Sequence, residues 1–246
     1  MRLIKTKSFE LAVISEGDVG SSKLAIVMPG RLDTKDYAQN PSHIKFLALK
    51  GYFALSFDPP GSWDSPGTLD LYSTTNYILA VNELIEYFGN KQTLLMGHSR
   101  GGTVAMLAGP KNPHVTHMIS VNSSYGGTID KKQPTPGELT VSYRDLPPGT
   151  TRTKEKKRFD LPWHYFEDSE KYNALEGLRA CTKPKLFFYG TKDELTTEEI
   201  VRHMYDVAND PKMIHELDTE HDYRLHPEII EEVNRVTGQF LDKYSA

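Results

Sequence analysis

Short apolar runs alternate with longer amphipathic segments along most of the chain. The runs have the length of buried strands and lie at residues 24–28, 52–57, 93–96, 115–121, 185–189 and 213–217. A short run that is apolar throughout is typical of a parallel strand that is buried on both faces. We therefore expect a parallel sheet built from these segments.

The segments between the runs indicate helices that pack on this sheet. Residues 72–88 and 227–244 carry apolar side chains at helical spacing, and residues 101–108 are small and apolar. Residues 2–15 instead predict an antiparallel hairpin at the sheet edge. Strand and helix alternate from residue 23 onward, which predicts right-handed crossovers and an α/β fold.

One stretch departs from this alternation. Residues 123–166 are rich in Gly, Pro, Thr and charge. A long loop inside a compact domain is usually a lid, a binding loop or a mobile segment. We therefore expect one domain, residues 1–246, with an inserted cap at 123–166. A basic run at 152–158 within the cap is either a solvated surface, which we favour, or an attraction for an anionic substrate.

Composition and charge exclude several classes of partner. The chain of 246 residues is 38% hydrophobic and 25% charged, as in ordinary globular proteins. Its net charge of −4 argues against a nucleic-acid partner. No apolar run approaches the roughly 18 residues of a membrane span. The single Cys181 and an N-terminal segment without an apolar signal region predict a cytoplasmic location.

A serine flanked by glycines follows the third apolar run. In Gly97-His98-Ser99-Arg100-Gly101 it lies between the predicted strand and the small-residue helix. Such a sharp turn strains the serine backbone and projects its Oγ above the sheet edge, which requires small residues two positions to either side. We therefore predict that Ser99 is a nucleophile, rather than an incidental serine in a glycine-rich turn.

A serine nucleophile needs a general base, and the base needs an orienting acid. Asp193 follows the fifth apolar run, at the sheet edge where open α/β sheets assemble their sites, and Glu194 is the adjacent alternative. Of nine histidines, His221 lies in the loop after the last run, from which it can reach Ser99. His98 adjoins the serine, but its side chain should point away from the Oγ. We predict Asp193 as the acid and His221 as the base.

The chain resembles the α/β-hydrolase superfamily over residues 2–244. Ser99, Asp193 and His221 occur in that family's order, each after a predicted strand. The resemblance is greatest to single-domain serine esterases, including the serine-aminopeptidase-like and monoacylglycerol-lipase-like branch. It implies an α/β-hydrolase fold, with a mostly parallel central sheet of about eight strands, helices on both faces and a small, loop-rich cap.

The resemblance also implies an oxyanion hole made of main-chain amides. Residues 28–31, Met-Pro-Gly-Arg, stand at the place of the family's His-Gly loop, with proline replacing the histidine. We assign the hole to the amides of Arg31 and Arg100, with Leu32 as the alternative to Arg31. In the segment that resembles the family's D-x-x-G-x-G-x-S motif, Trp63 stands where the second glycine is expected.

Three aromatic residues, Trp63, Trp163 and Phe166, are our candidates for the substrate pocket. The alternative is that the cap aromatics only pin the cap to the sheet. His114 and His117 have no cluster of carboxylates or thiols nearby in the sequence, so we expect neither a metal nor a cofactor.

These observations predict a serine hydrolase that cleaves small carboxylic esters through an acyl-enzyme. Ser99 attacks, His221 relays the proton, and Asp193 fixes the histidine tautomer. An amidase or aminopeptidase with the same three residues is the alternative within this class. A ligand-binding receptor and a lyase on the same fold are alternatives from other classes. The natural substrate and the oligomeric state stay open.

Overall fold

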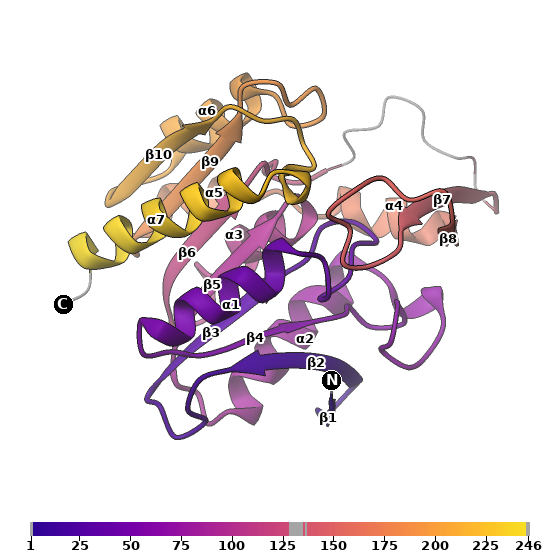
Figure 1. Cartoon of the computed structure of the whole chain (residues 1–246), viewed down its shortest axis with the longest axis horizontal. Coiled ribbons are helices and arrows are strands. Elements are labelled where there is room, and N and C mark those ends of the chain that lie inside the picture. The colour runs from indigo at the N-terminus through magenta and orange to yellow at the C-terminus, as the bar shows by residue number, and fades with distance from the viewer. Residues whose placement is uncertain (1, 128–134, 136, 245–246) are drawn as a thin grey trace.

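The computed structural model describes residues 2–127, 135 and 137–244 (Figure 1). Residues 128–134 and 136 of the expected cap, and residues 1, 245 and 246 of the expected domain, lie outside the described residues. Within the described part of the chain, none of the helices is both long and apolar enough to cross a membrane.

A mixed sheet of eight strands forms the centre of the molecule. The strands are β1 (Arg2–Lys5), β2 (Glu10–Glu16), β3 (Lys23–Met28), β4 (Phe53–Phe57), β5 (Gln92–His98), β6 (Val115–Val121), β9 (Lys185–Gly190) and β10 (Lys212–Leu217). Their order is β1-β2-β4-β3-β5-β6-β9-β10. Strand β2 runs antiparallel to both β1 and β4, and the other neighbours are parallel. The expected mostly parallel sheet with an antiparallel edge hairpin is confirmed.

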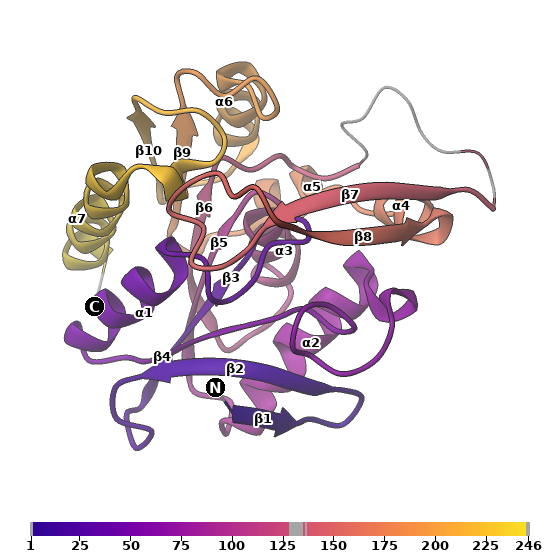
Figure 2. The same ribbon diagram turned by 45° about the vertical axis from the view of Figure 1, so that its right-hand side comes forward.

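Helices cover both faces of this sheet (Figures 1 and 2). They are α1 (Gln39–Leu49), α2 (Thr74–Tyr87), α3 (Arg100–Ala108), α4 (Trp163–Glu170), α5 (Leu175–Ala180), α6 (Glu198–Val207) and α7 (Pro227–Tyr244), with short 3₁₀ turns η1 (Leu69–Leu71) and η2 (Tyr223–Leu225). Apolar residues of α1 and α7 pack on one face, and those of α2, α3 and α6 pack on the other.

Burial on both faces explains why the strands are apolar throughout. In β3, Leu24, Ile26 and Met28 face the core formed with α2 and α3, whereas Ala25 and Val27 face α1 and α7. Successive side chains of a strand point to opposite faces, so both sets must be apolar. The carboxyl ends of the parallel strands are thereby left as the edge at which polar loops gather.

The segment between β6 and β9 contains more regular structure than the expected loop-rich cap. Strands β7 (Leu139–Asp145) and β8 (Lys156–Pro162) form an antiparallel hairpin that leads into α4 (Figure 2). Phe159 and Leu161 of β8 are buried in a small separate core with Leu32 and Tyr72. One face of the hairpin is therefore anchored to the main domain, and the other is exposed.

Candidate active site

The turn that carries Ser99 joins β5 to α3 at the carboxyl edge of the sheet. Ser99 has φ of 49° and ψ of −119°, a backbone conformation that L residues rarely adopt. A Cβ on Gly97 would lie 2.2 Å from the carbonyl carbon of Gly101, and one on Gly101 would lie 2.2 Å from the Met28 carbonyl oxygen. Glycine at both positions thus permits the close packing that this turn requires.

Two further loops bring His221 and Asp193 to the serine. The Oγ of Ser99 lies 2.9 Å from Nε2 of His221, which is in the loop after β10. The other ring nitrogen, Nδ1, lies 2.7 Å from Oδ2 of Asp193, which follows β9. The residues predicted separately from the sequence form one chain of hydrogen bonds. When the Nδ1–H of a neutral histidine donates to the carboxylate, its Nε2 is free to accept a hydrogen bond from the serine hydroxyl.

Asp193 is held as a carboxylate by its surroundings. Its side chain is fully buried. Oδ1 accepts the N–H groups of Leu195 and Thr196 at 2.8 and 2.9 Å, and Oδ2 also accepts the Thr196 hydroxyl at 2.5 Å. Burial raises the pKa of Asp193, but the hydrogen bonds from His221 and Thr196 offset this effect and lower the pKa overall. Glu194, the neighbouring alternative, is exposed.

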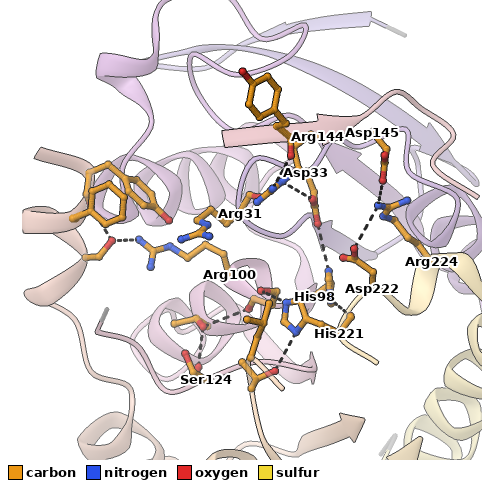
Figure 3. Close-up of a pocket in the computed structure, with 18 of the residues that line it drawn as sticks. Arg31, Asp33, His98, Arg100, Ser124, Arg144, Asp145, His221, Asp222 and Arg224 are labelled. Atoms are coloured by element: carbon orange, nitrogen blue, oxygen red, sulfur yellow. Dashed lines mark hydrogen bonds and ion pairs between the residues drawn. The ribbon is translucent and has the colours of Figure 1, made fainter. Parts of the chain in front are cut away.

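A second histidine and carboxylate, which the sequence analysis did not assign, lie behind His221. Nε2 of His98 donates to the main-chain carbonyl of His221 at 2.9 Å, and its Nδ1 lies 3.5 Å from Oδ2 of Asp33 (Figure 3). Burial lowers the pKa of His98, but Asp33 raises it overall. The position of Asp33, shortly after β3 at the carboxyl edge, is the signal by which the sequence could have indicated it.

The turn after β3 is fixed by two side-chain contacts. Leu32 has φ of 58° and is buried, its N–H donates to the Tyr72 hydroxyl at 2.7 Å, and its carbonyl accepts Trp63 Nε1–H at 2.8 Å. The Leu32 amide is therefore engaged away from the cavity. Arg31 and Arg100, the two residues proposed to supply oxyanion amides, both line the cavity that contains Ser99.

A cavity of about 280 Å³ contains Ser99, His98 and His221. Phe166, one of the three predicted pocket residues, lines it together with Tyr165. Trp63 and Trp163 are described residues that do not line it. Trp63 packs against Phe159 with ring centroids 5.4 Å apart, beneath the hairpin. Trp63 has a φ of 49°, in the left-handed region that glycine adopts most readily. This agrees with the glycine that the family motif has at this position.

Charged side chains dominate the rest of the cavity wall. Among the described residues, those that line it include the cations Arg31, Arg100, Arg144, Arg152, Lys156 and Arg224 and the carboxylates Asp33, Asp145 and Asp222. Buried Arg224 contacts Asp145 at 2.6 Å and Asp222 at 3.5 Å. Arg152 also contacts both carboxylates, at 3.5 and 2.6 Å. The hairpin residue Asp145 is thereby tied to the loop that carries His221.

The cavity holds polar groups suited to acyl chemistry. Among the described residues, no group of three His, Cys, Asp or Glu side chains is arranged to hold a metal ion. A hydroxyl with an adjacent imidazole, a buried carboxylate behind that imidazole and main-chain amides nearby are the parts that a serine nucleophile requires.

Comparisons with known proteins show the family to which this fold belongs. The chain belongs to the α/β hydrolase fold family, whose family model matches residues 26–159. A comparison with curated protein sequences finds no match.

Solved structures resemble the chain over nearly its whole length. Est1E from Butyrivibrio proteoclasticus, with ferulic acid bound, has a TM-score of 0.80 at 16% identity and covers 99% of this chain and 98% of its own. Mouse alpha/beta hydrolase domain-containing protein 10 has a TM-score of 0.78 at 18% identity, covering 99% of both chains. Esterase Pf2001 from Pyrococcus furiosus has a TM-score of 0.72 at 19% identity, covering 100% of this chain and 92% of its own.

Replacing Asp145 with Asn should change how stability depends on pH. Burial raises the pKa of Asp145, but Arg224 and the Thr153 N–H lower it overall, from 3.8 to about 2. The ionised carboxylate therefore stabilises the native state fully above its unfolded pKa, and this contribution is lost as the pH falls from about 4 to about 2. We expect wild type to lose on the order of 1–2 kcal/mol through this group over that interval, and Asp145→Asn to lack this loss while being less stable at pH 7.

Urea unfolding at a series of pH values measures this difference. Asp160→Asn is the matched control, because Asp160 lies on the same hairpin but is 42% exposed in its ion pair with Arg158. Its stability should follow the wild-type pH dependence. If the free energy of unfolding fell equally with pH in both variants, the buried ion pair of Asp145 would have no special role in acid stability.

Proposed function

We propose that the protein is a serine hydrolase that cleaves small carboxylic esters through an acyl-enzyme. The observation that carries this proposal is the hydrogen-bonded chain in the cavity, with 2.9 Å from Ser99 Oγ to His221 Nε2 and 2.7 Å from His221 Nδ1 to Asp193 Oδ2. Both distances lie within the hydrogen-bond range in which a base activates a hydroxyl nucleophile.

In the first half of the reaction, Ser99 Oγ attacks the ester carbonyl and His221 Nε2 takes the hydroxyl proton. Asp193 stabilises the imidazolium that forms and holds Nδ1–H toward itself. The tetrahedral intermediate collapses, the carbon–oxygen bond to the alcohol breaks, and His221 returns the proton to the departing alkoxide. A water molecule then attacks the acyl-enzyme in the same way, which releases the carboxylic acid and restores Ser99.

Negative charge develops on the carbonyl oxygen during both attacks. The amides of Arg31 and Arg100 are the proposed donors to this oxygen. Leu32 is not the donor in this proposal, because its N–H is bound by Tyr72 at 2.7 Å. Arg100 is also the first residue of α3, so the developing charge lies near the positive end of the helix dipole.

Amide or peptide hydrolysis with recognition of a free amine is less well supported. Such recognition needs a carboxylate that is available in the cavity. Of the acidic cap residues, Asp145 lines the cavity, but Arg224, Arg152 and Lys156 already surround it. Asp168 is instead bound to Thr75, whose N–H donates to it at 2.9 Å. The proposal therefore favours esters.

The comparisons support the same substrate class. Pf2001 is named an esterase, and the structure of Est1E holds ferulic acid, a carboxylic acid of the kind an esterase releases. The identities lie below 20%, so the choice of substrate rests on this chain's own cavity. A reducing, cytoplasmic location also stays part of the proposal, supported by the single cysteine, Cys181, which is free and buried.

Ser99→Ala tests the nucleophile. Because the variant keeps the fold but lacks the attacking oxygen, kcat for 4-nitrophenyl acetate should fall by on the order of 10⁴ to 10⁶, and fluorophosphonate labelling should be lost. Ser124→Ala, which changes another serine of the same cavity, should still be labelled. Labelling that persists in Ser99→Ala would overturn the assignment, and so would the absence of ester turnover by wild type.

Tyr72→Phe tests the turn that positions the Arg31 amide. Loss of the hydroxyl leaves the buried Leu32 N–H without its acceptor and loosens the turn. We expect kcat to fall roughly tenfold with a smaller change in KM, since the oxyanion forms only during the reaction. Steady-state kinetics on the same ester measure both values. Tyr87→Phe, an exposed tyrosine of α2, is the control and should match wild type, and equal kinetics in the two variants would contradict this role of Tyr72.

A further inference from the structure

The cavity wall carries an excess of positive charge. Its described lining includes six cationic side chains and three carboxylates, although the whole chain has a net charge of −4. Each carboxylate already contacts cations: Asp33 contacts Arg144, and both Asp145 and Asp222 contact Arg152 and Arg224. A cleft lined mainly by one sign of charge concentrates ligands of the opposite sign.

The partners of Arg100 among the described residues are neutral. Its Nη2 donates to the hydroxyls of Thr74 and Ser169, and its guanidinium lies over the Tyr165 ring, with Cζ 5.1 Å from the ring centroid. No described carboxylate forms an ion pair with it, and the side chain is half-buried. The two hydroxyls and the ring fix the orientation of the guanidinium, and within the described part of the chain no carboxylate compensates its charge. An ionised ligand group that accepts from its remaining N–H groups would compensate that charge.

The positive charge of Arg100 lies on one side of the bond that the proposed reaction breaks. In the proposed reaction His221 protonates the leaving alcohol, so the alcohol faces His221 and the acyl chain extends elsewhere. Figure 3 shows the Arg100 side chain extending away from His221, on the same side of the pocket as Arg31. The Tyr165 ring lies under the Arg100 guanidinium and has its centroid 5.0 Å from that of Phe166, and both rings line the cavity, where they offer apolar contact to methylene groups. Charge and apolar surface thus lie together on the acyl side.

We propose that the cavity selects esters whose acyl chain ends in a carboxylate, and that the Arg100 guanidinium binds this carboxylate. This inference rests on the proposed function and names the substrate class of that same site. A structural role for Arg100, in which it only ties α3 to Thr74 of α2 and Ser169 of α4, is the competing explanation. Such a role would affect turnover of charged and neutral esters alike.

Two pairs of esters separate these explanations. The esters of the first pair differ in charge at the end of the acyl chain. They are the mono-4-nitrophenyl ester of adipic acid, which ends in a carboxylate, and the 4-nitrophenyl ester of adipic acid monoamide, which ends in a neutral amide. The esters of the second pair differ in charge on the alcohol side: 4-acetoxybenzoate and 4-acetoxybenzamide. For each pair, the ratio of kcat/KM for the charged ester to that for the neutral one is measured after subtraction of the uncatalysed rate.

We expect wild type to prefer the charged ester of the acyl pair by about tenfold or more, because a charge-assisted contact with the remaining guanidinium N–H groups forms only with the carboxylate. The alcohol pair should show a ratio below about three. Added salt should reduce the acyl ratio by screening the contact. A wild-type acyl ratio near one or below, or a larger ratio for the alcohol pair, would overturn the proposal. If none of the four esters is turned over, the proposed function itself fails and this inference fails with it.

Variants of Arg100 assign the preference to its side chain. Arg100→Gln should bring the acyl ratio close to one, and Arg100→Lys, which keeps the charge but not the planar guanidinium fixed by Thr74, Ser169 and Tyr165, should give an intermediate ratio. The matched control is Arg235→Gln, which removes an exposed arginine of α7 outside the cavity and should keep the wild-type ratio. Because each ratio compares two substrates within one variant, a general loss of activity does not mimic the effect. A wild-type ratio in Arg100→Gln would contradict the proposal.

Discussion

Ser99 lies on a turn that exists only because glycines flank it, and the rest of the site is arranged around that turn. With φ of 49°, the serine is strained, and the backbone of Gly101 packs against Gly97 on one side and the Met28 carbonyl on the other. The Ser99 N–H also donates to the Val121 carbonyl at 2.9 Å. Strands β3, β5 and β6 thus jointly fix one hydroxyl group, and the catalytic proposal depends on its position.

The loop that carries His221 is held by hydrogen bonds from several other parts of the structure. His98 Nε2 donates to the His221 carbonyl at 2.9 Å, and the Asn122 amide donates to the same oxygen at 3.2 Å. Arg224, three residues further on, is bound to Asp145 of the hairpin at 2.6 Å. The loop is therefore anchored to β5, to the end of β6 and to the inserted segment. This anchoring limits the positions that the imidazole can adopt relative to Ser99.

Strong local signals in the sequence predicted the sheet and the Ser99 turn, whereas Asp193 and His221 were proposed from their positions after the last two apolar runs. Doubly buried strands such as β6 must be apolar throughout, and Ser99 required glycines at fixed positions. The pocket wall had no such signal. Strand β7 alternates apolar and polar residues but exposes its apolar ones, β8 begins with three charged residues, and Trp63 turns toward Leu32 and Phe159 through tertiary contacts that no local pattern encodes. The contact between His98 and Asp33 joins residues 65 positions apart, so only the folded chain places them together.

In the proposed reaction, Ser99 becomes acylated during turnover. The most direct test of this acylation is an acid-quenched reaction with an excess of 4-nitrophenyl acetate, followed by proteolysis and mass spectrometry of the peptides. Stoichiometric acetylation of the peptide that contains Ser99, absent from the His221→Ala variant quenched at the same time, is the predicted result. Turnover that proceeds without an adduct on Ser99 under conditions where deacylation is rate-limiting, or an adduct on a different residue, would contradict the account.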